Sequence, residues 1–558
     1  MNSRVPSAFR EKTPLLFALF VFLFSFGFLI YRSHFGVDFF DEPYYGALAL
    51  RLVLGQKLFV DELYLAQTFS ILTFPFVKLY WQMNQSLEGV LLFMRLLNAL
   101  FYLSLGLFIF ALFQKRVGKS MALLVAASCA LFFPGNMTTL GYNTLGTGFL
   151  TLSMMLSFFS LQTKHRILML LSGVAMGLAC ISYVTFCAMA LFYFGYLYFF
   201  EKQKQFSLCF ALGVGLALLG PGVFILNHWE SFLKALEFGK EYYHQAPTLS
   251  QLFHVIHKFF PKTVVLVSAV FFFSSHLAMK KSARVYFLLL ALAPIFAAWG
   301  CHLSFSGWSG YPFYLSLFSL VAYPRIKNQL LSQALLKWIF IPSIVAGLIT
   351  AGTSASGFFN AQVGLLPAVI AGLVFLGQAM TLEIASIQCL ALLPLSFPVF
   401  LLLCYPLNVW SDSEFSALTE KVSVGPYRGL YTATEKKKIA EESFQVLKPL
   451  LTSAGPLLIY PNGPSGYLVN PVPPAKGVTW YANSGKTNSI LADLYRTQMN
   501  PESRVIRMKV WYGTPTVKTI HHFEAGDALN NLIESTHHPI QETEWFTVFA
   551  PNTPSPKS

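Results

Sequence analysis

Long apolar runs recur along most of this chain of 558 residues, and they constrain its fold more than any other feature. A run of about 18 apolar residues is long enough for a helix to cross the hydrocarbon core of a bilayer. Charged residues make up only 11% of the chain, against about 25% in soluble domains. The runs predict a polytopic α-helical membrane protein with about 13 transmembrane helices, near residues 14–31, 89–113, 120–134, 143–161, 167–183, 185–200, 206–226, 260–278, 285–302, 309–323, 335–352, 363–379 and 384–404.

Basic residues give these helices an orientation, because Lys and Arg accumulate in short loops on the cytoplasmic side. The first run follows a basic segment near residues 4–12 and precedes no small-residue cleavage site, which indicates an uncleaved signal anchor with a cytoplasmic N-terminus. The loops near 135–142, 303–308 and 353–362 contain neither Lys nor Arg, so we assign them to the outside. An odd number of spans then leaves the C-terminal region outside as well.

The formal net charge of +14 would suggest a nucleic-acid partner in a soluble protein. Here most of the basic excess falls in the cytoplasmic loops, so topology explains it. We therefore expect a lipid bilayer as partner and no nucleic acid. The seven cysteines lie in apolar runs with neither disulfide nor zinc spacing, and we assign them no function: Cys129, Cys180, Cys187, Cys209, Cys301, Cys389 and Cys404.

The composition becomes that of a soluble domain from about Asn408 onward, with near-balanced charge and frequent Gly and Pro. We expect a transmembrane module over residues 1–404 and a small extracytoplasmic α/β domain over residues 405–558. That domain contains no phosphate-binding glycine loop or nucleophile elbow, which favours a lid or docking module. Its expected strands are Pro456–Tyr460, Val478–Tyr481, Val505–Trp511 and Trp545–Phe549. Its expected helical stretches lie near Thr487–Arg496 and Asp527–Ser535.

The segment that begins at Gly36 carries the most informative motif, an acidic pair, Asp41 and Glu42, directly before Pro43. Proline is well placed at the first position of a helix, so the two acids fall at the helix N-terminus. The pattern predicts an amphipathic helix at the membrane surface that ends at Gly55. Acids at this position also favour the helix dipole, by about 0.3–1 kcal/mol each. A capping role and a catalytic role therefore both remain open at this point.

An early Asp41-Glu42 pair followed by Tyr44 and a helix, within this topology, resembles the GT-C superfamily of membrane glycosyltransferases. The similarity is greatest to protein O-mannosyltransferases and to bacterial transferases that move aminoarabinose onto lipid A. It covers the membrane part by architecture and residues 36–60 by motif. The resemblance implies that the first-loop acid lies at the catalytic centre and that the donor is a sugar on polyprenyl phosphate. It also implies a place in the bacterial cytoplasmic (inner) membrane.

The turn Gly141-Tyr142-Asn143 leads into the expected fourth span, where such enzymes often carry polar site residues. Several relatives place a second acid in this loop, and this chain has none. A bound divalent metal therefore stays open. Tyr183 stands where many relatives have Lys, and the small residues from Gly173 onward fit close helix packing.

Polyprenyl phosphate is already a competent leaving group, so the reaction implied by the resemblance needs little acid assistance. It needs a base for the acceptor hydroxyl and positive charge for the departing phosphate. Asp41 is the expected base of an inverting transfer, with Glu42 positioning it or the acceptor. The expected phosphate-binding and substrate-binding residues are Tyr44, Arg51, Lys57, Arg95, Tyr142, Asn143, His228 and His244.

Three other classes of protein share part of this pattern. A transporter or lipid flippase would also be long and apolar, but it would usually show internal repeats or charges at mid-membrane. An envelope scaffold would act through its C-terminal domain and would not need Asp41. An O-antigen ligase type of enzyme shares the lipid donor but lacks the early Asp-Glu pair.

Overall fold

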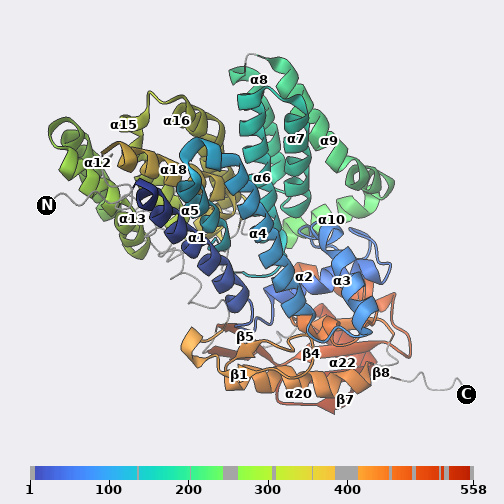
Figure 1. Ribbon diagram of the computed structural model, residues 1–558. Coiled ribbons are helices and arrows are strands. Elements are labelled where there is room, and N and C mark those ends of the chain that lie inside the picture. Colours follow the sequence, from blue (N-terminus) through green and yellow to red (C-terminus); the bar gives the residue numbers. More distant parts are fainter. Residues whose placement is uncertain are drawn as a thin grey trace, which may run out of the picture.

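The computed structural model shows a helical bundle joined to a smaller α/β unit formed by the C-terminal part of the chain (Figure 1). The described residues are 7–132, 134, 137–201, 203–242, 262–303, 310–354, 356–383, 412–451, 455–479, 485–514, 517–520 and 527–552. The expected span at 384–404 and the expected boundary between residues 404 and 405 lie outside them.

The first half of the bundle consists of apolar helices that pack against one another. Helix α7 packs against both α6 and α9, and a Cβ atom at Gly173 would lie 2.1 Å from the carbonyl oxygen of Phe210. The small residues of α7 therefore serve close helix packing, as the sequence indicated. These helices are α1 (Ser7–Arg32), α4 (Val90–Val117), α5 (Lys119–Ala130), α6 (Tyr142–Thr163), α7 (Arg166–Ser182), α8 (Phe186–Phe200) and α9 (Lys204–Asn227).

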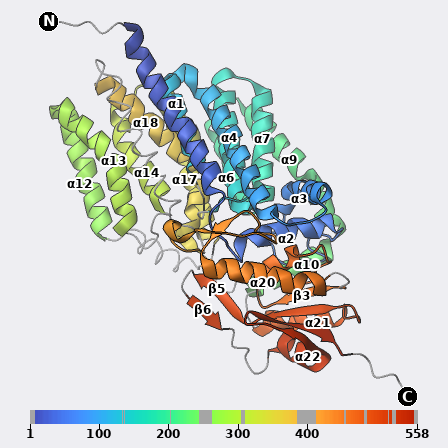
Figure 2. The same ribbon diagram turned by 60° about the horizontal axis from the view of Figure 1, so that its bottom comes forward.

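The second half of the bundle is more broken, and its helices surround α18, which lies against α14, α5 and α6. Figure 2 shows α12 and α13 side by side at the edge of the molecule. The elements are α12 (Lys262–Lys281), α13 (Ala283–Leu303), α14 (Tyr311–Ser319), η3 (Leu320–Ala322), α15 (Tyr323–Ile326), α16 (Leu330–Leu335), η4 (Leu336–Phe340), α17 (Ile341–Gly352), η5 (Gly357–Gly364) and α18 (Leu366–Glu383).

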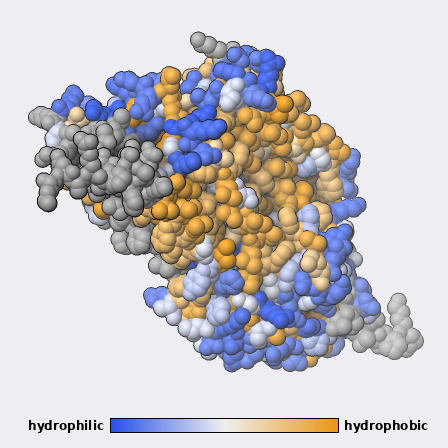
Figure 3. All heavy atoms as spheres, in the orientation of Figure 1, coloured by the Kyte–Doolittle hydropathy of each residue, from blue (hydrophilic) through white to orange (hydrophobic). Residues whose placement is uncertain are grey.

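Within the described residues, five helices are long and apolar enough to cross a membrane: Pro14–Arg32, Val90–Val117, Tyr142–Thr163, Lys204–Asn227 and Leu330–Gly352. Shorter apolar helices, such as α5 and α8, accompany them. Each apolar run that the structure describes contains a helix. The surface over the bundle is largely hydrophobic, whereas the C-terminal unit is largely hydrophilic (Figure 3).

The first loop, which follows α1, forms two helices rather than one, α2 (Asp41–Val53) and α3 (Ser70–Asn84). The expectation of an amphipathic surface helix is wrong for α2, because every residue from Asp41 to Arg51 is buried. The C-terminal unit covers α2 from one side, and the bundle and α3 cover it from the other (Figure 2). Helix α10 (Trp229–Tyr242) braces the same region, where its Phe232 ring contacts the ring of Phe59 at 5.1 Å.

The C-terminal unit contains a four-stranded sheet with the strand order β3-β4-β8-β7, in which only β3 and β4 run parallel. The expected strands are confirmed except at Val478–Tyr481, whose described residues Val478 and Thr479 lie in no strand. The elements are η7 (Phe415–Ala417), β1 (Glu420–Lys421), β2 (Tyr431–Thr432), α20 (Thr434–Leu450), β3 (Leu457–Tyr460), η8 (Pro464–Leu468), α21 (Gly485–Arg496), β4 (Arg504–Met508), β5 (Val510–Thr514), β6 (Val517–Ile520), α22 (Ala528–Thr536), β7 (His537–Glu542) and β8 (Phe546–Pro551).

The hydrophobic core of this unit continues into the first loop. One buried cluster contains Tyr44, Leu48 and Leu50 of α2 together with Leu457 of β3 and Val548 of β8. A second cluster fills the helical bundle. By its packing, the first loop therefore belongs as much to the C-terminal unit as to the bundle.

Candidate functional site

The acidic motif begins with a residue that the sequence analysis did not select. Asp38 is buried, and its carboxylate accepts hydrogen bonds from the backbone N–H groups of Phe40, Asp41 and Glu42 at 3.0, 2.8 and 3.0 Å. These bonds satisfy amides that lack a partner at the start of α2. Asp38 is therefore the cap of this helix, so capping does not have to come from Asp41 or Glu42.

Glu42 pairs with Arg95 of α4 in the interior of the protein. The Arg95 guanidinium donates to both oxygens of Glu42 and to the carbonyl oxygens of Ser33, Phe35 and Gly36. These bonds use all five N–H groups of the guanidinium. In this structure Arg95 fixes Glu42 and the segment before α2.

Asp41 lies at the first turn of α2 with 9% of its surface exposed. Its charge acts on the phenol of Tyr45, whose pKa lies well above its ordinary value because of burial, and then because of the neighbouring Tyr142 and Asp41. Tyr45 therefore stays protonated and can donate a hydrogen bond. Its hydroxyl donates to the sulfur of Met137 at 3.0 Å, a weak acceptor that a better one could replace.

Tyr142 and Asn143 begin α6 beside this tyrosine. The rings of Tyr45 and Tyr142 meet edge to face at 5.4 Å, and Tyr183 continues the row at 5.6 Å from Tyr142. Asn143 is 4% exposed, and its Oδ1 atom accepts no hydrogen bond from the described residues. A buried carbonyl oxygen without a donor costs about 1–3 kcal/mol, so this atom is well suited to accept a hydroxyl from a ligand.

Gly141, the cap of α6, lets this turn approach α2. A Cβ atom here would lie 2.5 Å from the Tyr45 ring, which is closer than real Cβ contacts. A glycine at this position therefore allows the Tyr142-Asn143 turn to pack directly on the start of α2. Through Tyr45, the structure thus joins the start of α2, which carries Asp41, to the Tyr142-Asn143 turn of a distant segment of the chain.

Arg51 and Lys57 lie at the other end of α2. Ten residues of helix separate Arg51 from Asp41, or about 15 Å along the axis. Arg51 is buried and donates to Thr479, Gln56 and the carbonyl oxygens of Asp61 and Ala475. The structure therefore places Arg51, and Lys57 beyond the end of α2, at the opposite end of this helix from Asp41.

The structure describes two of the remaining sequence candidates, Tyr44 and His228. Tyr44 is fully buried and donates to the carbonyl oxygen of Ala66, so it supports the fold of the first loop. His228 follows α9, where its ring packs at a tilt against that of Phe224 with a centroid distance of 4.7 Å. His244 lies outside the described residues.

Among the residues that the structure describes, no group of three or more His, Cys, Asp and Glu side chains is arranged to hold a metal ion. Asp38, Asp41 and Glu42 are all acids, but the carboxylate of Asp38 accepts hydrogen bonds from three backbone N–H groups and that of Glu42 pairs with Arg95.

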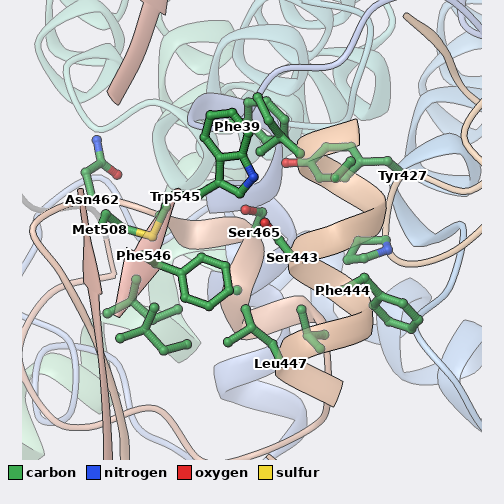
Figure 4. A pocket seen from close by; sticks show the side chains of 18 of the residues that line it. Phe39, Tyr427, Ser443, Phe444, Leu447, Asn462, Ser465, Met508, Trp545 and Phe546 are labelled. Atoms are coloured by element: carbon green, nitrogen blue, oxygen red, sulfur yellow. The ribbon is translucent and has the colours of Figure 1, made fainter. Parts of the chain in front are cut away.

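A mainly apolar cavity of about 60 Å³ lies between the acidic motif and the C-terminal unit (Figure 4). Phe39 and Phe40 form one wall, and Tyr427, Trp545 and residues of α20 form others. The side chains of Phe39 and Trp545 both line the cavity (Figure 4). A cavity with this lining favours a small uncharged group, and its wall is the segment between the cap Asp38 and Asp41.

The sequence matches no protein-family model and no curated protein. An oligosaccharyltransferase of Archaeoglobus fulgidus, tethered to an acceptor peptide with the NVT sequon, is similar over 96% of this chain and 74% of its own, with 12% identity and a TM-score of 0.46. ArnT of Cupriavidus metallidurans in the apo state is similar over 95% of this chain and 97% of its own, with 12% identity and a TM-score of 0.41. ArnT of Cupriavidus metallidurans bound to undecaprenyl phosphate is similar over 97% of this chain and 98% of its own, with 14% identity and a TM-score of 0.39. At these values the similarities assign no activity to this chain.

Proposed function

We propose that this chain is a membrane glycosyltransferase that moves a sugar from polyprenyl phosphate to a hydroxyl of a lipid, glycan or protein on the extracytoplasmic side. The observation that supports this proposal is the placement of Asp41, at the start of a buried helix and beside the tyrosines that meet α6. Asp38 caps that helix and the Glu42–Arg95 pair anchors it, so the carboxylate of Asp41 is held in a fixed position.

The proposed reaction is a single displacement with inversion. Asp41 accepts the proton of the acceptor hydroxyl, and the acceptor oxygen forms a bond to the anomeric carbon of the sugar. The bond between that carbon and the phosphate oxygen breaks, and polyprenyl phosphate leaves with the electron pair. Glu42 takes no part in proton transfer in this proposal. Its carboxylate pairs with Arg95 and so helps to hold Asp41 in position.

Uncharged side chains are proposed to bind the phosphate and the sugar of the lipid-linked substrate, since Arg51 and Arg95 are engaged elsewhere. Tyr142 stands at the N-terminal end of α6, where the helix dipole favours an anion. The buried Oδ1 atom of Asn143 would accept a hydroxyl of the sugar. This set replaces the cationic phosphate site expected from the sequence.

The proposal is tested by measuring release of the lipid product. Purified protein in lipid nanodiscs would be given polyprenyl-phosphate-linked sugars extracted from bacterial membranes together with an envelope fraction as acceptor. We expect undecaprenyl phosphate to accumulate, as measured by mass spectrometry. A flippase would move the donor without cleaving it, and a scaffold would leave it unchanged. Either of these results would contradict the proposal.

Replacement of Asn143 by Ala is expected to raise KM for the donor about tenfold, since a hydrogen bond to a buried group contributes about 1–2 kcal/mol. The melting temperature should change little, because Oδ1 accepts no bond from the described residues. The control is Asn84→Ala, which changes an exposed amide at the end of α3. An unchanged KM in the Asn143 variant would remove this residue from the proposed donor site.

Transfer is also expected to fall as the pH is lowered from 7 to 5, with a midpoint near 6. Burial, and then the charge of Glu42, raise the pKa of Asp38 to about 6, while Lys436 acts in the opposite direction. Tyr427 also faces Asp38, and its hydroxyl donates to the Asp38 carbonyl oxygen. Protonation weakens the charged cap of α2, so Asp41 is held less firmly.

The sign of the stability effect separates this loss from unfolding. The pKa of Asp38 is higher in the folded chain than its ordinary value of 3.8, so proton uptake between about pH 6 and 4 favours the folded state. The rate should therefore fall before the protein unfolds. A pH–rate profile recorded beside melting temperatures checks this order. A rate that stays constant from pH 7 to 5 would rule out the dependence on Asp38.

A further inference from the structure

The segment before α2 runs beside a distant part of the C-terminal unit. The backbone N–H of Gly36 donates to the carbonyl oxygen of Tyr431 at 2.7 Å. The backbone N–H of Tyr431 donates to the carbonyl oxygen of His34, also at 2.7 Å. The hydroxyl of Tyr427 donates to the carbonyl oxygen of Asp38 at 2.9 Å. These bonds join the helix cap to residues nearly 400 positions later in the chain.

Two charged side chains of the C-terminal unit complete this contact, and both are buried. Asp412 accepts a hydrogen bond from the N–H of Val37 at 2.6 Å and another from the hydroxyl of Thr432 at 2.5 Å. Lys436 of α20 donates to the carbonyl oxygen of Val37 at 2.9 Å and lies 4.0 Å from Asp412. Asp412 and Lys436 therefore bind the backbone N–H and the carbonyl oxygen of one residue, Val37, directly before the cap Asp38.

The C-terminal unit also holds the far end of α2. Arg51 donates to Thr479 at 2.7 Å and to the carbonyl oxygen of Ala475 at 3.0 Å, and Gln56 donates to that of Pro474 at 2.6 Å. In the middle of the helix, a Cβ atom at Gly46 would lie 3.1 Å from the side chain of Leu468. Helix α2 is thus fixed along its whole length by residues 412–479.

Buried charges are a costly way to pack two segments together, because apolar residues of similar volume often stabilise a fold equally well. A charged pair that binds the backbone does fix the position of that backbone more strictly. Here the fixed backbone is that of Val37, next to Asp38, whose carboxylate in turn holds the amides of Asp41 and Glu42. The chain of contacts from α20 to Asp41 is continuous.

We infer that Asp412 and Lys436 are positioning residues for the proposed transfer, which set Asp41 through the Val37–Asp38 segment. This inference rests on the proposed function. It replaces the expected lid or docking module with a C-terminal unit that forms one side of the catalytic site. The two residues touch neither donor nor acceptor, and they act through the cap of α2.

The test compares Lys436→Met with Lys437→Met in the full chain. Lys437 is the next residue of α20 and pairs with Glu420 at the surface, so it is a matched control for charge and helix position. Hydrogen exchange of the peptide that covers residues 36–45 is measured by mass spectrometry. We expect at least tenfold faster exchange there in Lys436→Met and wild-type exchange in Lys437→Met. Thr432→Val, which removes one bond to Asp412 without removing a charge, is a milder variant if Lys436→Met does not fold.

The kinetic readout uses transfer from undecaprenyl-phosphate-linked sugar. Lys436→Met should lower kcat at least tenfold, leave KM for the donor within about twofold, and move the acidic limb of the pH–rate profile to higher pH, because the Lys436 charge acts on Asp38. Wild-type exchange and kcat in Lys436→Met, or in Thr432→Val if only that variant folds, would overturn the inference. Absence of transfer by the wild-type protein would instead overturn the proposed function, and the exchange measurement would still decide whether the two residues hold the segment.

Discussion

Replacement of Asp41 by Asn is expected to reduce the rate of sugar transfer by about 10³-fold, within the range that a general base contributes. The amide keeps the size of the carboxylate but accepts no proton at neutral pH. Donor binding should change little, because the proposed donor contacts come from Tyr142 and Asn143 on α6. The loss should therefore appear in kcat. It is measured as release of undecaprenyl phosphate by purified variants at pH 7.

Asp61→Asn provides the matched control for this substitution. Asp61 is an acid of the same loop, but it accepts the backbone N–H of Lys57 and pairs with Lys476 at the far end of α2. Its variant should transfer within about twofold of the wild type, since surface ion pairs contribute about 0–1 kcal/mol. Equal rates of transfer by Asp41→Asn and the wild type would contradict the assignment of Asp41 as the base.

Arg95→Leu is expected to destabilise the protein by about 3–5 kcal/mol, the usual effect of removing one partner of a buried ion pair. The substitution removes the Arg95 cation from the buried carboxylate of Glu42 and removes its N–H donors from the carbonyl oxygens of Ser33 and Gly36, while the carbonyl oxygen of Phe35 keeps a hydrogen bond from Arg32. The effect is measured as a lower melting temperature in detergent or nanodiscs, and as loss of transfer at a temperature where the variant is still folded.

The double variant Arg95→Leu/Glu42→Leu tests the cause of that destabilisation. Removal of both charges should recover much of the stability, because a buried pair can often be replaced by apolar residues with little loss. It should not recover transfer, since the segment before α2 stays unanchored. A single variant Arg95→Leu that melts like the wild type would show that the pair does not hold the first loop.

The helical elements could be predicted from the sequence because each depends on a local pattern. Runs of apolar residues predicted α4, α6 and α9, and the strand at β3 followed from the short run Pro456–Tyr460. Pro43 predicted the start of α2 to within two residues, since the helix begins at Asp41. The identity of its cap could also have been read, since Asp38 stands three residues before Asp41 and four before Glu42, a spacing typical of a helix N-terminus.

The roles of the arginines could not be predicted from the sequence. Arg51 and Arg95 each looked suited to a phosphate, because a charge beside apolar residues needs a partner. Arg51 donates to Thr479, more than 400 residues away, and lies 3.3 Å from the carboxylate of Glu62, while Arg95 pairs with Glu42, which lies 53 residues before it. No local pattern indicates such pairs.

The contribution of the C-terminal unit was hidden for the same reason. Asp412 and Lys436 are ordinary charged residues in the sequence, and α20 carries several other lysines. Their importance follows from tertiary contacts with Val37. The close approach of Tyr45 and Tyr142 likewise depends on packing between α2 and α6.

The most direct test of the proposed site is a structure of the protein in nanodiscs with undecaprenyl phosphate bound. The phosphate should lie between Tyr142 and Asn143, roughly 5–6 Å from the carboxylate of Asp41, because reacting atoms meet at about 3–3.5 Å. The prenyl chain should leave this point toward the bundle. A phosphate bound only at the opposite end of α2, near Lys57, would contradict the proposed site.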